Sequence, residues 1–99
     1  MNAQEIFEHM QREAAVLAYV SFPECSVCTS LRPKIEQLVS EYDTVDFLYV
    51  DSHKHPSVSG QWLVFAAPTL ILFQQGREVK RWSRVFSVDE VRLVLDQME

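Results

Sequence analysis

Residues 16–28 read VLAYVSFPECSVC and join an apolar run to a pair of cysteines. The run over residues 16–22 is rich in β-branched and aromatic side chains, which predicts a strand buried on both faces. From residue 28 to residue 42 the apolar positions recur with the period of a helix. Cys25 and Cys28 are therefore expected at a strand–helix junction, where unpaired N–H groups and the helix dipole stabilise a thiolate.

The rest of the chain predicts an α/β fold around this junction. The segment 45–51, VDFLYVD, indicates a second buried strand, parallel to the first because a helix lies between them. Pro33 is expected to interrupt and kink that helix. The element order predicts a four-stranded mixed sheet with helices on both faces. The remaining expected elements are a helix over 3–13, a short helix over 57–65 carrying Val58, Trp62 and Phe65, a buried strand over 69–73, a turn over 74–77, an edge strand over 78–83, and a final helix opened by a Ser87–Glu90 capping box.

Three interpretations of the cysteine pair follow from its spacing. In the first, Cys25 attacks a disulfide and Cys28 resolves the mixed disulfide. In the second, both are buried cysteines with no chemical role. In the third, His53 and His55 complete a zinc site, although their spacing is tighter than zinc sites normally use. We favour a solvated loop for residues 52–55 and expect no metal site.

Length and composition restrict the class of protein. The 99 residues fit one domain spanning 1–99, and the net charge of −5 argues against nucleic acid and membrane partners. Two glycines, Gly60 and Gly76, are too few for a Walker loop or a dinucleotide fingerprint. No segment has the pattern of a signal peptide or a membrane span, so we expect a cytoplasmic location. We also expect a monomer.

Five motifs stand in a fixed order along the chain. They are the C-x-x-C pair, Pro33 eight residues after Cys25, Val50-Asp51, Ala67-Pro68-Thr69, and Phe73 with Gly76 and Val79. Together they resemble the motifs of the thioredoxin family. The resemblance covers nearly the whole chain and implies a thioredoxin fold that lacks the leading strand. It implies a thiol–disulfide oxidoreductase that acts on protein or low-molecular-weight disulfides, receives electrons from a reductase or thiol donor and contributes to redox homeostasis. The only redox group implied is the Cys25–Cys28 disulfide, with no cofactor.

The resemblance also implies a substrate groove beside the cysteines. In the family the proline at position 68 is cis and faces the cysteine pair, and residue 67 pairs with an extended substrate. The alternative function, a non-catalytic binding module, would use the same groove around Trp62, Ala67 and Pro68.

Departures from the family pattern concern charge near the cysteines. Glu24 stands where an aromatic residue is usual, and its carboxylate is expected to raise the pKa of Cys25. Tyr19 falls at the position of a buried aspartate and Phe47 at that of a lysine, which favours the binding-module alternative. Arg84 replaces a glycine on the rim of the site, where its charge would favour small anionic disulfides.

Overall fold

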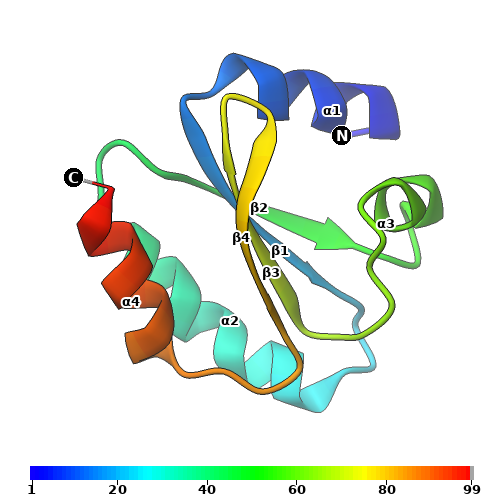
Figure 1. Cartoon of the computed structure of the whole chain (residues 1–99). Helices are drawn as coiled ribbons and strands as arrows, with labels where there is room; N and C mark the ends of the chain where they lie inside the picture. The colour runs from blue at the N-terminus through cyan, green and yellow to red at the C-terminus, as the bar shows by residue number, and fades with distance from the viewer. Residues whose placement is uncertain (99) are drawn as a thin grey trace.

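A computed structural model describes residues 1–98, which form one four-stranded sheet covered by four helices (Figure 1). The strands follow the order β2-β1-β3-β4, with β1 parallel to β2 and antiparallel to β3. This confirms the predicted mixed sheet. The elements are α1 (Ala3–Arg12), β1 (Ala15–Ser21), α2 (Ser26–Val39), β2 (Asp46–Asp51), α3 (Pro56–Gln61), β3 (Thr69–Gln74), β4 (Arg77–Ser83) and α4 (Val88–Gln97).

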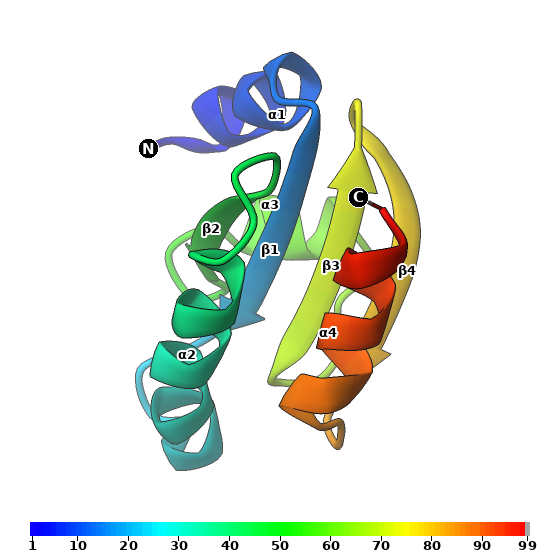
Figure 2. The same ribbon diagram turned by 90° about the vertical axis from the view of Figure 1, so that its left-hand side faces the viewer.

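Helices cover both faces of the sheet. Figures 1 and 2 show α2 and α4 on one face, and α1 and α3 on the other. Alternation along β1 sends Leu17 and Tyr19 into the core under α2 and α4, and Val16 and Val20 into the core under α1 and α3. All seven residues of β1 are buried, as a central strand with apolar side chains on both faces requires.

The prediction of a second strand buried throughout is wrong. Strand β2 lies at the edge of the sheet, and only Val50 and Asp51 within it are buried. Its aromatic residues Phe47 and Tyr49 are half-buried and pack against the core under α2. A strand with one neighbour loses less water-exposed area on folding than a central strand, even where it carries an apolar run such as FLYV.

Two helix boundaries also differ from the predictions. Helix α2 begins at Ser26 and continues through Pro33 to Val39 without the expected interruption. Helix α3 ends at Gln61, so Phe65 lies beyond it and 88% of its surface is exposed. At α4, Ser87 caps as predicted, its side chain accepting the N–H of Glu90.

Strand β4 and the residue that follows it fix both ends of the segment that connects α3 to β3. The guanidinium of Arg81 donates to the carbonyls of Trp62, at 2.6 Å, and Leu63, at 3.0 Å. At the other end, the N–H of Arg84 donates to the carbonyl of Pro68 at 2.9 Å. The segment 62–68 is therefore hydrogen-bonded at both of its ends.

Candidate active site

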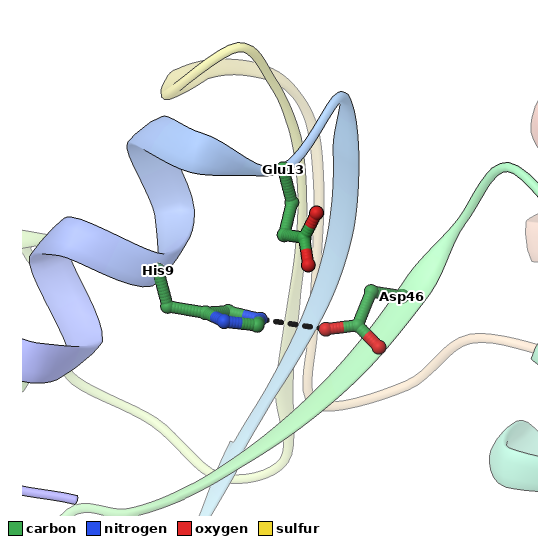
Figure 3. Close-up of side chains that lie close together, drawn as sticks. All are labelled: His9, Glu13 and Asp46. Atoms are coloured by element: carbon green, nitrogen blue, oxygen red, sulfur yellow. Dashed lines mark hydrogen bonds and ion pairs between the residues drawn. The ribbon is translucent and has the colours of Figure 1, made fainter.

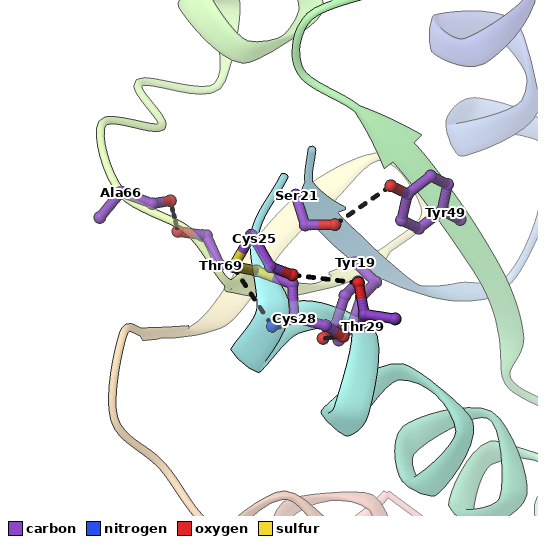
Figure 4. Close-up of a disulfide and its surroundings, with 8 residues drawn as sticks. All are labelled: Tyr19, Ser21, Cys25, Cys28, Thr29, Tyr49, Ala66 and Thr69. Carbon is purple, nitrogen blue, oxygen red and sulfur yellow. Dashed lines mark hydrogen bonds between the residues drawn. A yellow bond between two sulfur atoms is a disulfide. The ribbon is translucent and has the colours of Figure 1, made fainter. Parts of the chain in front are cut away.

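The cysteine pair lies where β1 gives way to α2 (Figure 4). Cys25 and Cys28 form a disulfide, with their Cα atoms 5.2 Å apart. Cys25 is the N-cap of α2, and its Sγ accepts the N–H of Cys28 at 3.2 Å. Cys25 is partly exposed, whereas Cys28 is 1% exposed. The helix start therefore presents one sulfur to solvent and holds the other in the core.

The start of β3 lies beside the disulfide. The Ala67–Pro68 peptide bond is cis, as the resemblance implied. Ala67 and Cys25 both pack against the core cluster under α2 and α4. The Thr69 hydroxyl donates to the carbonyl of Ala66 at 2.7 Å and fixes the turn before the strand (Figure 4).

Tyr19 fills the space beneath the cysteines. Its side chain is fully buried, and its hydroxyl donates to the carbonyl of Cys28 at 2.6 Å. Burial raises the pKa of Tyr19 to about 12, neighbouring Tyr49 adds to the rise, and the Arg32 charge opposes it. The phenol therefore stays protonated at neutral pH. It supports the first turn of α2 and is a poor acceptor for a proton.

An ion pair that the sequence analysis missed flanks Cys25. Glu24 Oε1 lies 3.2 Å from His53 Nδ1, and the His53 ring stacks on Phe22 with centroids 4.8 Å apart. The signal was available, because parallel strands end at the same edge and residues after Ser21 and Asp51 must meet there. His53 of the loop over residues 52–55 therefore lies beside the cysteines while it stays exposed, as expected for a solvated loop.

A hollow of about 340 Å³ opens beside this ion pair, lined by residues that include Phe22, His53, Phe65 and Ala67. Trp62 does not line this hollow. Its ring packs against Phe7 and Phe73 in the core under α1 and α3. Trp62 is therefore a packing residue of this core, and its expected role in the groove stays a prediction.

The alternative zinc set, Cys25 and Cys28 with His53 and His55, does not come together within residues 1–98. The three ligating side chains that do meet there are His9, Glu13 and Asp46, whose ligating atoms lie within 4.8 Å of one another (Figure 3). They lie at the opposite end of β1 from the cysteines, and His9 Nε2 contacts Asp46 Oδ2 at 2.6 Å. This group lies far from the disulfide, and its shortest contact joins the His9 ring to the Asp46 carboxylate.

Comparison with known proteins identifies the family. The Thioredoxin family model matches residues 1–96. The chain belongs to the thioredoxin family. It is 37% identical to a thioredoxin of Chlamydia trachomatis over 79 residues, covering 80% of this chain and 78% of the relative.

Solved thioredoxins share the fold. Thioredoxin 1 of Thermosipho africanus superposes with a TM-score of 0.79 at 34% identity, over 84% of this chain and 92% of its own. A Plasmodium falciparum thioredoxin superposes with a TM-score of 0.90 at 15% identity, over 99% and 95% of the two chains. Family, fold and the disulfide at the family's active-site position together make this chain a thiol–disulfide oxidoreductase. In the part of the chain that the structure describes, no helix combines the length and apolarity needed to cross a membrane.

Arg84 occupies a backbone conformation that suits glycine. Its φ is +66°, and its side chain is exposed. A non-glycine residue in the left-handed region costs about 1 kcal/mol, so Arg84→Gly should raise the free energy of unfolding by about that amount. Urea unfolding measures the change. The control is Lys80→Gly on the preceding strand β4, which should destabilise, because glycine gains nothing where φ is ordinary. A destabilised Arg84→Gly would show that side-chain contacts outweigh the backbone term.

The unequal exposure of the two sulfurs predicts unequal reactivity. After reduction, a limiting amount of iodoacetamide should label Cys25 ahead of Cys28, because Cys28 is 1% exposed and Cys25 lies at the open helix start. Peptide mass spectrometry gives the ratio of the two products. Preferential labelling of Cys28 would reverse the roles assigned to the two thiols.

Proposed function

We propose that this thioredoxin-family chain reduces disulfides of protein substrates, with Cys25 as the attacking thiol and Cys28 as the resolving thiol. The observation that carries the proposal is the pairing of a partly exposed sulfur at the N-cap of α2 with a buried sulfur one turn along. The unpaired N–H groups of the first helical turn favour the thiolate form of the exposed cysteine. These N–H groups stabilise the thiolate form of the buried Cys28 less.

The reaction proceeds in two exchanges. The Cys25 thiolate attacks one sulfur of the substrate disulfide, forms a mixed disulfide and releases the other substrate sulfur as a thiolate. Cys28 then loses its proton and attacks Cys25 Sγ, which breaks the mixed disulfide and releases the second substrate thiolate. Two electrons have passed to the substrate, and the Cys25–Cys28 disulfide remains. A dithiol donor or an upstream reductase returns it to the reduced form, and no cofactor is required in the chain.

A set of exposed apolar side chains supports a protein substrate. Val27 is 62% exposed, Phe65 is 88% exposed and Val85 is 92% exposed. They belong to three segments that meet at one end of the sheet, because β1 ends where β3 begins and β4 ends. We call this set the apolar rim. Exposed apolar side chains grouped around a reactive sulfur suit a partner that buries them on binding.

Arg84 adds a positive charge to the same end of the sheet, since its N–H binds the carbonyl of Pro68. We therefore propose that Arg84 biases the chain toward anionic disulfides. In Arg84→Gly, the ratio of oxidised-glutathione to insulin reduction should fall and the alkylation of Cys25 should move to higher pH. An unchanged ratio and an unchanged pH profile would leave Arg84 as a surface residue only.

The direct test is insulin reduction by dithiothreitol, followed by precipitation of the released B chain. The reduced chain should accelerate precipitation in proportion to its concentration, because each molecule turns over many times. The alternative function, a non-catalytic binding module, gives no acceleration. The cytoplasmic location and the monomeric state expected from the sequence stay predictions.

A further inference from the structure

A second hollow lies on the other side of the disulfide, against the buried cysteine. It measures about 190 Å³ and is lined by Ser21, Cys28, Thr29, Arg32, Pro33, Glu36 and Tyr49. A cavity of this size with polar walls has room for several water molecules, each with partners for hydrogen bonding. The hollow therefore gives the Cys28 thiol a route by which its proton can reach solvent.

One cation lines this hollow. Arg32 follows Cys28 by four residues on α2, so the two side chains lie on the same helix face with Cβ atoms about 6 Å apart. The guanidinium carbon of Arg32 lies 3.8 Å from the centre of the Tyr49 ring, and Arg32 Nε donates to Glu36 Oε1 at 2.6 Å. The ring of Tyr49 on β2 and the carboxylate one turn further along α2 thus hold Arg32 beside the resolving cysteine.

Among the residues that line the second hollow, Arg32 is the one cation and Glu36 the one carboxylate. Tyr49, which also lines it, accepts a hydrogen bond from Ser21 at 3.2 Å (Figure 4). The charge of Arg32 also lowers the pKa of Tyr19, which lies beneath the disulfide. Glu24, the residue before Cys25, contacts His53 instead. This contact lies beside the 340 Å³ hollow described above, which we call the first hollow.

We propose that Arg32 stabilises the Cys28 thiolate and so promotes the resolving exchange. The inference rests on the resolving role proposed for Cys28 above. In the step concerned, the proton of Cys28 passes to water in the second hollow, and the sulfur lone pair attacks Cys25 Sγ. The bond from Cys25 to the substrate sulfur breaks, and that sulfur leaves as a thiolate. Arg32 acts as a positioning charge and neither gains nor loses a proton.

The size of the effect follows from distance and exposure. A unit charge at about the 6 Å Cβ spacing would shift a pKa by about two units at most near a protein surface. Solvent at the Arg32 side chain, which is 42% exposed, and the Glu36 carboxylate at 2.6 Å both reduce this shift. We expect a shift of about one unit for Cys28, which is about tenfold in thiolate population below the pKa.

Two measurements test the proposal. In a Cys25→Ser background, the pKa of Cys28 is read from thiolate absorbance against pH, and Arg32→Gln should raise it by about one unit. In the two-cysteine chain, an aromatic disulfide that releases a coloured thiol should give a first phase from Cys25 and a second phase from Cys28. Arg32→Gln should slow the second phase about tenfold and leave the first within twofold. Arg32→Lys, which keeps the charge, should recover most of both effects.

Control variants separate this effect from folding and from net charge. Arg12→Gln removes the same charge from the exposed end of α1 and should change neither phase. Glu36→Gln keeps an oxygen that can accept from Arg32 Nε, so Arg32 stays in place, and it removes a charge that opposes the thiolate. The second phase should therefore be unchanged or faster. A slower second phase in Glu36→Gln would make that carboxylate the proton acceptor and overturn the proposal, as would unchanged kinetics and an unchanged Cys28 pKa in Arg32→Gln. A parent chain without two phases would instead contradict the proposed function.

Discussion

Replacing Cys25 with serine should abolish the reduction of protein disulfides, with a loss of at least about a thousandfold in turnover. A serine hydroxyl remains protonated at neutral pH and is a poor nucleophile toward sulfur. The remaining thiol cannot take over, because Cys28 is 1% exposed beneath the first turn of α2. Insulin reduction measures the loss, and circular dichroism checks that the variant is folded.

The matched variant is Cys28→Ser, which keeps the attacking thiol and removes the resolving one. It should complete the first exchange and stop, so that a covalent complex with the substrate accumulates and dissolves on addition of dithiothreitol. Non-reducing electrophoresis detects the complex. If Cys25→Ser formed the complex and Cys28→Ser did not, the two thiols would have the opposite roles.

The second large effect concerns stability and not chemistry. Tyr19→Ala should lower the free energy of unfolding by about 3–5 kcal/mol, because it leaves a cavity between α2 and the sheet. The phenol ring lies near two further aromatic rings, Phe47 at 6.1 Å and Tyr49 at 6.2 Å between centroids, and these cannot close the space without moving. The free energy of unfolding of a small domain is about 5–15 kcal/mol, so this variant would lose a large share of its stability.

The conservative variant Tyr19→Phe separates packing from the hydroxyl. It keeps the ring and removes one hydrogen bond to the carbonyl of Cys28, so its cost should be about 1 kcal/mol. Urea unfolding of the reduced proteins gives both numbers. The turnover of Tyr19→Phe should stay within a few-fold of the parent, since the pKa of Tyr19 is raised to about 12. A tenfold loss of turnover would show that the hydroxyl takes part in the reaction.

The sequence predicted what depends on local pattern. The apolar run before Cys25 predicted a buried strand and the period after Cys28 predicted a helix, so the junction followed. The resemblance of Ala67-Pro68-Thr69 to the family motif implied the second half of the site. These features are short-range, and no knowledge of strand order is needed to infer them.

The features that the sequence analysis missed depend on which elements become neighbours. The four residues FLYV within β2 are as apolar as a buried strand, and the strand order makes β2 an edge. The contact between Trp62 and Phe7 could not be predicted from the sequence, because it depends on where α1 packs against the sheet. Arg32 was passed over because a search for apolar periodicity ignores charged residues, and its partner Tyr49 comes from another element.

The two attachments of the α3–β3 connection to β4 have a consequence for how this protein can diverge in evolution. Arg81 fixes the carbonyls of residues 62 and 63, and the backbone of Arg84 fixes Pro68, so residues 64–67 form a short bridge between two anchors. Both anchors act through backbone carbonyls, which every amino acid supplies. Substitutions at Phe65 and Ala66 can therefore accumulate with little penalty to the sheet while they reshape the wall of the first hollow. A new substrate preference could arise there through single mutations, without a compensating change elsewhere in the chain.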